Sequence, residues 1–495
     1  MAIAISQTRS GYSFNKPVMQ EILRLSLALC SESYLVGGSV RDTILGKNKI
    51  TDLDIAVEGD GFGVAREISN QLSVKSSFVP LDKKHRTGRI VVPEDHGQIT
   101  VDISSFRGSN IGEDLIGRDF TINAIAVHLW DVINGRVAQN IFDPLDGRRD
   151  IERRIIRICS ETSLSDDPLR MLRAFRFASQ LGFSIDPGTR LGISKSAKLI
   201  GNVSGERIRD ELEIVLHCNR STQIIEQMVE TSLFWEIFPE LLPTRGFEQN
   251  AFHHLDVWEH TIEALENMEN LIENLESVFG VFSDRIREYI YEQLVSGRPR
   301  IWLLKLAILF HDSGKPFSLS VDEKGRRRFI GHEKISRSLI LEAGGRLRLA
   351  ARELSEVSSW VGGHMRLSIL NLENLSDRAL LRLHHKSGVH FVGLILIYLA
   401  DISAARGTAR KAEEFTRARM GAKKAIELAF QEDEKTVKPL LDGVQLMEEF
   451  GLEQGPRLGS ILRWLVTEQA LGTIRDQEQA RQALHRYLYQ HPVNK

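Results

Sequence analysis

Residues 34–57, which read YLVGGSVRDTILGKNKITDLDIAV, decide the fold of this chain. The short apolar run at 34–36 ends in two glycines, so it predicts a strand that enters a tight turn. Glycines after a strand allow the backbone to approach a ligand closely, and the helix expected next offers free N–H groups to an anion. Arg41 adds a planar guanidinium that can hold phosphate oxygens. Gly37, Gly38 and Arg41 are therefore candidates for a phosphate-binding turn, although a plain turn is the alternative.

Two carboxylates open the next apolar run, at 52–57 (DLDIAV). Positions i and i+2 of a strand face the same side, so we expect Asp52 and Asp54 to lie side by side. Two like charges this close are costly unless a cation lies between them, and oxygen ligands favour Mg²⁺. An isolated D-x-D could equally be an exposed turn. Beside the phosphate-binding turn, however, it predicts metal-assisted nucleotidyl transfer from a triphosphate.

The rest of the chain divides into a mixed and a helical part. Further strands are expected at 89–92 and 98–103 and a helix at 16–30, which makes the first 150 residues an α+β region with a small mixed sheet. From about residue 151 strands become rare, so the fold class is an α+β head followed by all-α domains. The run 239–246 (PELLPTRG) predicts a linker, and 391–400 (FVGLILIYLA) predicts a buried helix that is too short to span a bilayer.

Composition narrows the class of protein. The 495 residues carry a net charge of −2, with 42% hydrophobic and 26% charged residues, which excludes collagen-like, disordered and uniformly basic chains. This length predicts about three domains. The cysteines Cys30, Cys159 and Cys218 form no C-x-x-C and fit a reducing compartment. The first residues show no signal-peptide pattern. We expect a cytoplasmic protein with no membrane partner.

These motifs resemble the head of the tRNA nucleotidyltransferase and bacterial poly(A) polymerase family, which belongs to the DNA polymerase beta superfamily. Three more motifs follow in the family's order. Residues 118–124 (RDFTINA) resemble its ribose-contacting motif, 143–147 (DPLDG) its hinge between head and neck, and 166–170 (DDPLR) its base-reading motif. The resemblance covers about residues 34–216 and implies an enzyme that binds CTP or ATP.

The resemblance also implies residue roles. Asp52 and Asp54 would be catalytic and hold Mg²⁺, and Asp102 on a nearby strand is a candidate third carboxylate. Nucleotide contacts are implied for Gly37, Gly38, Arg41, Arg118, Asp119, Asn123, Asp167, Arg170, Arg173 and Arg176.

The base-reading motif has a chemical reason. Cytosine and adenine each present an amino donor that a carboxylate accepts, and an arginine can donate to the ring acceptors beside it. One Asp167–Arg170 pair could therefore select C and A without a nucleic-acid template. A solvated basic helix face is the alternative for Arg170, Arg173 and Arg176. Just after the head, a cluster of arginines suits an RNA backbone: Arg148, Arg149, Arg153, Arg154 and Arg157.

The middle of the chain holds a second set of chemistry-bearing residues. His311-Asp312 ends an apolar helix and precedes Gly314 and Pro316, and imidazole with carboxylate suits a hydrolytic metal site. The set resembles the HD phosphohydrolase domain, which implies a second divalent metal, with Lys315 facing a phosphate. The alternative is a helical scaffold that has lost catalysis. The implied metal ligands are His260, His311, Asp312, His332, His364 and Asp401.

The resemblance also sets domains and specificity. It implies a catalytic head at 1–150, a base-reading and tRNA-binding neck at 151–242, an HD domain at 243–410 and a helical tail at 411–495 that contacts tRNA. Only ten residues, 108–117, separate Arg107 from Arg118, and a single arginine precedes Asp119 where the family usually has two. Family members that build the whole CCA end have a longer flexible segment there. The short segment resembles the CC-adding subgroup.

We therefore predict a template-independent tRNA nucleotidyltransferase that adds CMP, AMP or both to build the CCA end, and we favour CC addition with a separate A-adding enzyme acting on the product. Poly(A) polymerase is the second hypothesis. A third makes the HD domain the main activity, as a metal-dependent phosphohydrolase. A non-catalytic RNA-binding protein is a fourth hypothesis, which the carboxylates disfavour because binding alone needs no D-x-D.

Overall fold

The computed structural model describes residues 14, 16–47, 52–82, 86–95, 97–137, 139–249, 255–370, 372–405, 412–433, 439–470 and 472–490. The chain forms two compact units. The first comprises residues 1–215 and 223–237, and the second residues 216–222 and 238–495. The finer division into head, neck, HD domain and tail stays a prediction.

One mixed sheet of seven strands organises the beginning of the first unit. Its order is β3-β4-β5-β2-β1-β6-β7. Only β2 and β5 pair in parallel, and the other neighbours are antiparallel. This confirms the predicted α+β head. The strands are β1 (Ser33–Val36), β2 (Asp52–Val57), β3 (Ser77–Asp82), β4 (Thr87–Glu94), β5 (Gly97–Ser105), β6 (Ala126–His128) and β7 (Ile141–Phe142).

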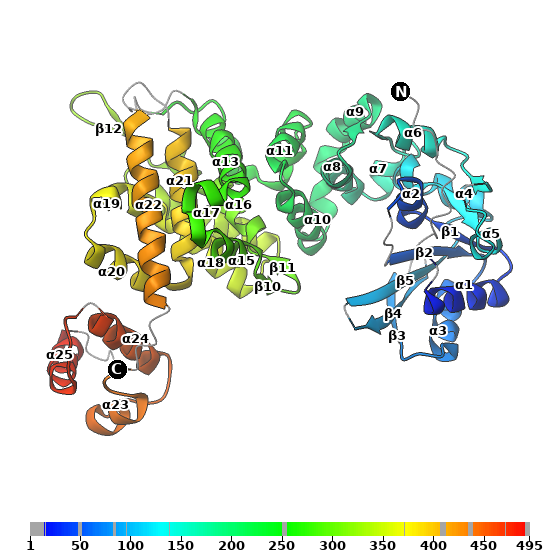
Figure 1. Cartoon of the computed structure of the whole chain (residues 1–495). Helices are drawn as coiled ribbons and strands as arrows, with labels where there is room; N and C mark the ends of the chain where they lie inside the picture. Colours follow the sequence, from blue (N-terminus) through cyan, green and yellow to red (C-terminus); the bar gives the residue numbers. More distant parts are fainter. Residues whose placement is uncertain are drawn as a thin grey trace. The chain divides into compact units, whose positions relative to one another are not determined.

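Short helices cover this sheet. α1 and α3 lie on one side of the strands and α2 on the other (Figure 1). α1 starts at Pro17, where a missing N–H costs nothing, and buries Met19, Ile22, Leu23 and Ser26 at helical spacing. The helices of the head are α1 (Pro17–Leu29), α2 (Gly38–Ile44), α3 (Gly61–Gln71), α4 (Ile111–Ile116), the 3₁₀ helix η1 (Thr121–Asn123) and α5 (Leu129–Ile133).

Helices dominate after the head, as predicted. α8 carries the predicted base-reading arginines and starts one residue after Pro168, which is its N-cap. The elements here are α6 (Gly147–Arg153), β8 (Ile155–Ile156), α7 (Ser163–Asp166), α8 (Leu169–Leu181), β9 (Ser184–Ile185), α9 (Pro187–Ser196), η2 (Ala197–Asn202), α10 (Gly205–His217), α11 (Ser221–Glu230) and α12 (Leu233–Ile237).

The second unit is built on two apolar helices, α16 and α21. Every residue of α16 is buried, and α13, α17 and α18 surround the pair. Its first elements are η3 (Pro239–Thr244), α13 (Val257–Glu273), α14 (Leu275–Phe279), η4 (Gly280–Phe282), α15 (Ser283–Tyr291), β10 (Gln293–Val295), β11 (Arg298–Pro299), α16 (Ile301–Phe310), η5 (Lys315–Phe317), β12 (Ser320–Val321), β13 (Arg327–Arg328), α17 (His332–Arg346) and α18 (Ala351–Gly363).

The second unit continues with a long apolar stretch. Residues 377–404 are long and apolar enough to cross a membrane by length and composition, but 67% of their most apolar window is buried, as in a core helix. The elements here are α19 (Met365–Leu370), η6 (Leu372–Asn374), α20 (Asp377–Ser387), η7 (Gly388–His390), α21 (Phe391–Ala404), α22 (Ala412–Asp433), α23 (Gly443–Phe450), α24 (Pro456–Ala470) and α25 (Gln477–Gln490).

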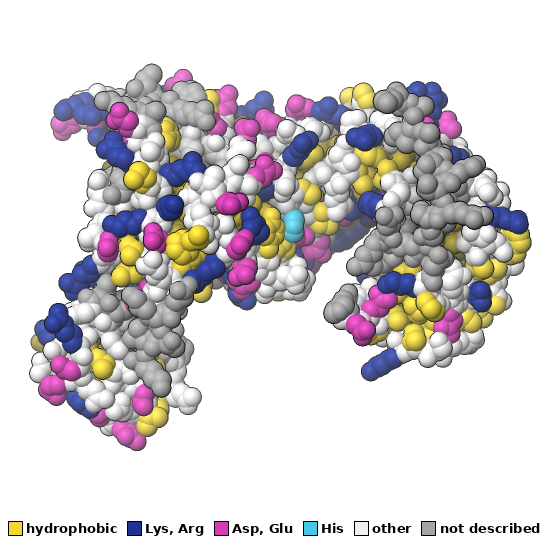
Figure 2. Space-filling view, viewed as in Figure 1, with side chains coloured by type: hydrophobic (Ala, Val, Ile, Leu, Met, Phe, Trp, Pro, Cys, Tyr) yellow, Lys and Arg dark blue, Asp and Glu magenta, His cyan; other side chains and the backbone are white. Residues whose placement is uncertain are grey.

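The last helices fall into two groups. α22 packs against α20 and α21. α23, α24 and α25 enclose a separate apolar core that includes Leu446, Ile461 and Leu484. Basic and acidic side chains are interspersed on the visible face of this unit (Figure 2). The near-zero net charge of the chain is thus an average over mixed surface charges.

Candidate functional site

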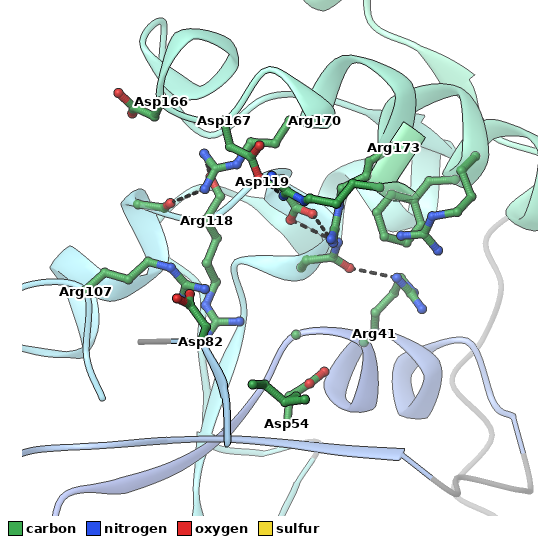
Figure 3. A pocket seen from close by; sticks show the side chains of 18 residues that line it. Arg41, Asp54, Asp82, Arg107, Arg118, Asp119, Asp166, Asp167, Arg170 and Arg173 are labelled. Carbon is green, nitrogen blue, oxygen red and sulfur yellow. Dashed lines mark hydrogen bonds and ion pairs between the residues drawn. The ribbon is translucent and has the colours of Figure 1, made fainter. Parts of the chain in front are cut away.

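A cavity of about 1090 Å³ in the first unit gathers the predicted nucleotide-binding residues. Asp54 lies at one side of this cavity, with Asp167 and Arg170 at the opposite side and Arg41 on α2 (Figure 3). Of the residues predicted to be catalytic or to bind nucleotide, all of which the structure describes, Asp52 and the candidate third carboxylate Asp102 do not line the cavity. The predicted residues that do are Gly37, Gly38, Arg41, Asp54, Arg118, Asp119, Asn123, Asp167, Arg170, Arg173 and Arg176.

Gly37 forms the turn between β1 and α2, and this turn passes close to Asp54 and Arg118. Its φ of +69° is a backbone conformation that favours glycine. A Cβ at this position would lie 3.0 Å from Asp54 Oδ2 and 3.3 Å from an Arg118 Nη1. The turn can therefore approach the carboxylate and the guanidinium only because residue 37 has no side chain. The N-terminus of α2 begins at Gly38, directly after this turn.

The carboxylates of β2 and β5 are neighbours in the sheet. Asp54 is in register with Asp102 on the parallel strand β5. Burial and the Asp102 charge raise the pKa of Asp54, and the Arg118 guanidinium opposes them. Asp102 is held by a bidentate ion pair with Arg89, at 2.7 and 2.8 Å. Asp52, at the exposed start of β2, accepts a hydrogen bond from Thr100 Oγ1.

This donor set fits a hard divalent cation. Asp52 and Asp54 offer carboxylate oxygens at positions i and i+2 of one strand. A cation there would relieve the unfavourable burial of charge that raises the pKa of Asp54. The predicted Mg²⁺ site is therefore compatible with the residues present.

Four predicted residues form one hydrogen-bonded chain. Arg41 Nη1 donates to Asn123 Oδ1 at 2.7 Å, and Asn123 Nδ2 donates to Asp119 Oδ1 at 3.1 Å. Arg173 on α8 completes the chain through an ion pair with Asp119 Oδ2 at 2.6 Å. Burial alone would raise the pKa of Asp119. The Arg173 charge and two hydrogen bonds lower this pKa by more than burial raises it, so the net shift is downward. The predicted phosphate-binding segment and the predicted base-reading helix are thus connected through Asn123 on η1 and Asp119.

The predicted base-reading pair is held by other groups in this structure. Asp167 Oδ2 forms an ion pair with Arg207 on α10 at 2.9 Å. Arg170 Nη2 donates to the Gly117 carbonyl at 2.9 Å, and its Nη1 donates to Ser163 Oγ at 2.9 Å. Both residues line the cavity, so they stand where a base edge could reach them. Their assignment as the reading pair stays a prediction.

A buried carboxylate that the sequence analysis did not single out organises the segment before Arg118. Asp114 on α4 is fully buried. It accepts from Arg107 Nη1 at 3.0 Å and forms an ion pair with Arg118 Nη2 at 2.8 Å. Asp114 thus fixes both arginines at the edge of the cavity.

Several lining residues have no sequence signal of their own. Arg107 in the connection after β5, Phe177 on α8 and Arg207 on α10 are brought together only by the tertiary structure. Leu81, Asp82, Gly117 and Asp166 complete the lining. Asp166 belongs to the quoted base-reading motif, so its position beside Asp167 was the available clue.

The arginine cluster around α6 is largely unpaired. Arg157 is bound by Asp150 and Asp186. Within the described part of the chain, the other arginines of the cluster form no ion pair: Arg148, Arg149, Arg153 and Arg154. Their guanidiniums remain available to phosphates.

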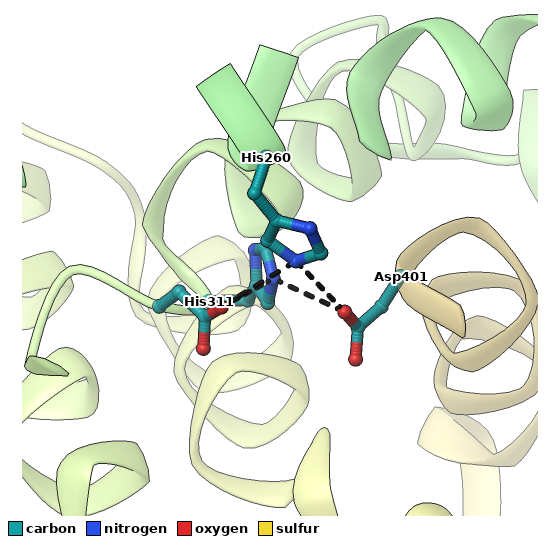
Figure 4. Close-up of side chains that lie close together, drawn as sticks. His260, His311 and Asp401 are labelled. Atoms are coloured by element: carbon teal, nitrogen blue, oxygen red, sulfur yellow. Dashed lines mark hydrogen bonds and ion pairs between the residues drawn. The ribbon is translucent and has the colours of Figure 1, made fainter. Parts of the chain in front are cut away.

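The predicted HD ligands converge in the second unit. His260 Nε2 lies 3.0 Å from Asp401 Oδ1, and His311 Nε2 lies 3.3 Å from Asp312 Oδ2. Figure 4 shows His260, His311 and Asp401 turned toward one another, with His260 on α13, His311 at the end of α16 and Asp401 on α21. On the other side of the shared carboxylate, Asp312 Oδ1 lies 3.2 Å from His332 Nε2. Two potential metal-binding groups result, one of His260, His311, Asp312 and Asp401 and one of Asp312, His332 and His364.

Backbone carbonyls fix the imidazoles for metal binding. The Nδ1 atoms of His311, His332 and His364 each lie 2.7 Å from the carbonyl three residues earlier. A carbonyl only accepts, so each Nδ1 carries the hydrogen and each Nε2 lone pair points into the cluster when the ring is neutral. The His332 and His364 Nε2 atoms are 3.2 Å apart. Two lone pairs at this distance repel, and a cation would relieve the repulsion.

The carboxylates of the cluster favour a positive charge beside them. Burial lowers the pKa of His311, but Asp312 and Asp401 outweigh it and raise that pKa to about 10. Burial also lowers the pKa of His364. Lys315 Nζ lies 2.5 Å from Asp312 Oδ2 and donates to Gln249 Oε1 at 2.6 Å. Lys315 therefore supplies positive charge beside the cluster, where we predicted that it would face a phosphate.

Three protein-family models match successive parts of the chain. Residues 33–157 match the family described as Poly A polymerase head domain. Residues 182–244 match "Probable RNA and SrmB- binding site of polymerase A", and residues 257–405 match HD domain. The cavity is lined by residues of the first matched region, by residues 166–177 that follow it and by Arg207 in the second region. All six predicted HD ligands lie within the third.

Curated relatives match almost the whole chain. An A-adding tRNA nucleotidyltransferase of Deinococcus radiodurans is 32% identical over 92% of this chain and 96% of its own. A CC-adding tRNA nucleotidyltransferase of Thermus thermophilus is 29% identical over 91% and 92%. The Thermotoga maritima CCA-adding enzyme complexed with tRNA shares the fold, with a TM-score of 0.57, 22% identity and 95% coverage of both chains. The chain therefore belongs to the tRNA nucleotidyltransferase and poly(A) polymerase family of enzymes, and it carries an HD domain.

Proposed function

We propose that this enzyme extends the 3′ end of tRNA with CMP and is a CC-adding tRNA nucleotidyltransferase. The observation that carries the proposal is the short connection between Arg107 and Arg118. β5 ends at Ser105 and α4 already begins at Ile111. Longer flexible segments at this place go with the switch from C to A addition in the family that the sequence resembles. A short connection supports a single specificity.

The contacts of this connection support the same conclusion. Ser109 N–H donates to Glu113 at 2.7 Å, and Asn110 caps α4 by accepting from Glu113 N–H at 3.0 Å. Asp114 holds Arg107 and Arg118 from within. A segment held by this many contacts has little freedom to change the proposed base-reading site from one that binds C to one that binds A.

The proposed chemistry follows from the cavity. The tRNA 3′-hydroxyl would attack the α-phosphorus of CTP, a new phosphodiester bond would form, and pyrophosphate would leave. Asp52 and Asp54 would hold Mg²⁺, which supplies activation of the hydroxyl and neutralisation of the phosphates. The turn at Gly37 and Gly38, with Arg41, would hold the triphosphate.

Base choice would rest on α8. Asp167 would accept from the exocyclic amino group of cytosine, and Arg170 would donate to the ring acceptors beside it. Both side chains have other partners in this structure, namely Arg207 and the Gly117 carbonyl. Nucleotide binding would therefore exchange these contacts for contacts with the base.

The remaining partners follow from charge and product. The unpaired arginines near α6 would bind the tRNA backbone, because guanidiniums there have no competing carboxylate in the described chain. A product that ends in CC needs a separate A-adding enzyme. We propose that the enzyme acts in the cytoplasm, where it would meet tRNA and nucleotides.

The test uses tRNA that lacks CCA and tRNA that ends in CC, each incubated with CTP or ATP alone. We expect two CMP additions to the first RNA, and none of AMP to either. Efficient AMP addition to tRNA ending in CC would overturn CC specificity in favour of A or CCA addition. Repeated AMP addition to an unrelated RNA would favour poly(A) polymerase.

A second function is supported by the HD cluster, whose ligands form two groups that share Asp312. We propose that this site binds divalent metal and hydrolyses a phosphoester. His311, Asp312 and their neighbours would hold the metal, which supplies a nucleophilic hydroxide near neutral pH. Lys315 would hold a substrate phosphate oxygen.

Bis(p-nitrophenyl) phosphate with added Mn²⁺ or Mg²⁺ would test this second function. Hydrolysis by the wild type, its loss in His311→Ala and its retention in Asp54→Asn are expected. The second function fails if the wild type is inactive with each metal, or if Asp54→Asn removes hydrolysis together with nucleotide addition.

A further inference from the structure

Phe177 is an aromatic side chain in the wall of a cavity whose other lining groups are mostly charged. It lies on α8, is only 5% exposed and lines the nucleotide cavity. The ring of Phe120 packs edge-on against it, with centroids 5.6 Å apart and an interplanar angle of 82°. Phe177 is thus fixed from behind by the core of the head.

Three guanidiniums surround this one ring. Arg176 Cζ lies 4.0 Å from the centroid of Phe177, Arg41 Cζ 5.3 Å and Arg173 Cζ 5.7 Å. All three distances lie within the range of a cation–π interaction, about 6 Å. Arg41 comes from the phosphate-binding turn, whereas Arg173 and Arg176 belong to the base-reading helix.

The ring solves an electrostatic problem at this place. Three positive charges converge on a poorly hydrated wall, and Arg41 is itself only 7% exposed. Burial and the neighbouring Arg173 charge lower the pKa of Arg176, and Glu211 opposes them. Each guanidinium has a carboxylate partner: Asp42 for Arg41, which also donates to Asn123, Asp119 for Arg173 and Glu211 for Arg176. The negative face of the aromatic ring adds to this stabilisation without a further carboxylate that would repel a triphosphate.

We propose that Phe177 is a positioning residue that holds Arg41, Arg173 and Arg176 in the geometry that binds the nucleotide triphosphate. It acts through the three guanidiniums and not on the reacting atoms. The proposal rests on the proposed use of this cavity for nucleotidyl transfer. An aliphatic side chain of similar size would fill the space and would leave the three cations without their common partner.

The test compares three variants by CMP addition to tRNA. Phe177→Leu removes the π face, Phe177→Tyr keeps it, and Phe175→Leu makes the same substitution two residues away at a fully buried position outside the cavity lining. We expect Phe177→Leu to raise KM for CTP roughly tenfold with kcat changed less than about threefold, because ground-state phosphate binding is weakened. Inhibition by inorganic tripolyphosphate should weaken by a similar factor.

The controls separate positioning from structure. Phe177→Tyr should stay within about threefold of the wild-type KM, because its ring still faces the cations. Phe175→Leu should lower the melting temperature and leave KM for CTP unchanged. The proposal is overturned if Phe177→Leu leaves KM unchanged, if Phe177→Tyr fails to restore it, or if Phe175→Leu raises it equally. A wild type that adds no nucleotide would instead refute the proposed function.

Discussion

At the residue scale, Asp54 concentrates the chemistry of the head. It is the D-x-D carboxylate that lines the cavity, and burial beside Asp102 raises its pKa. We predict that Asp54→Asn lowers kcat for CMP addition by at least about a thousandfold, because a neutral amide is a poor Mg²⁺ ligand. Asp95→Asn, an exposed position outside the cavity, is the matched control. Activity of Asp54→Asn within tenfold of the wild type would remove Asp54 from the catalytic centre.

A second prediction at the residue scale concerns Asp114 and the pH dependence of the stability that its ion pairs contribute. Burial alone would raise the pKa of Asp114. The charges of Arg118 and Arg107 lower this pKa by more than burial raises it, so the pKa in the folded protein lies below that in the unfolded chain. The stabilisation is therefore fully present above about pH 4 and is lost as the pH falls through the folded pKa. Asp114→Asn should destabilise the first unit by about 3 kcal/mol at pH 7, because the buried guanidinium of Arg118 and the partly exposed one of Arg107 lose their counter-charge.

Thermal unfolding of the wild type and Asp114→Asn at pH 7 and at pH 3 checks this prediction. The difference in melting temperature should shrink at the lower pH, since the wild-type carboxylate then approaches protonation. A difference that is constant or larger at pH 3 would show that the ion pairs do not carry the stabilisation.

At the element scale, the turn between β1 and α2 is the segment that we propose holds the triphosphate beside Asp54. We predict that Gly37→Ala lowers activity at least about a hundredfold, because its Cβ would press against Asp54 and Arg118 at a positive φ. Gly46→Ala is the control, since Gly46 has a similar φ of +73° and nothing within 4 Å of an added Cβ. CMP addition should survive in Gly46→Ala with a loss of stability of about 1 kcal/mol. Equal loss of activity in both variants would point to backbone strain alone.

Some of these elements could be predicted from the sequence, and others could not. The strand–turn–helix of 34–44 and the D-x-D strand were predictable because glycines and alternating apolar residues mark them directly. The predicted linker at 239–246 is different: residues 239–244 form η3, with Leu241 and Thr244 buried. Proline content indicates a turn but carries no information on what packs over it. The role of Phe177 could not be predicted from the sequence, because only the tertiary structure brings Arg41 on α2 to the ring that Arg173 and Arg176 already flank on α8.

At the scale of the whole molecule, two chemistries occupy separate compact units. The nucleotide cavity lies in the first unit and the HD cluster in the second. We predict that the purified enzyme binds divalent metal at the HD cluster whether or not Asp54 is replaced. Asp312→Asn should lose about two metal ions per chain and His364→Ala about one, because Asp312 belongs to both ligand groups.

Elemental analysis of dialysed wild type, Asp312→Asn, His364→Ala and Asp54→Asn after loading with Mn²⁺ measures this prediction. Equal metal content in the wild type and Asp312→Asn would contradict a shared ligand. The short connection at 108–117 also concerns the whole molecule, because the effect that we propose for it is a choice of product. Sequence indicated its length, and the structure added the contacts of Asn110 and Asp114 that fasten it.

We propose that this enzyme adds two C nucleotides to the 3′ end of tRNA and adds no A. The most direct measurement supplies CTP and ATP together, at equal concentration, to tRNA that lacks CCA, and sequences the 3′ ends of the products over time. We expect the ends to accumulate as CC, even after long incubation. Ends that proceed to CCA, or tracts of A without C, would contradict it.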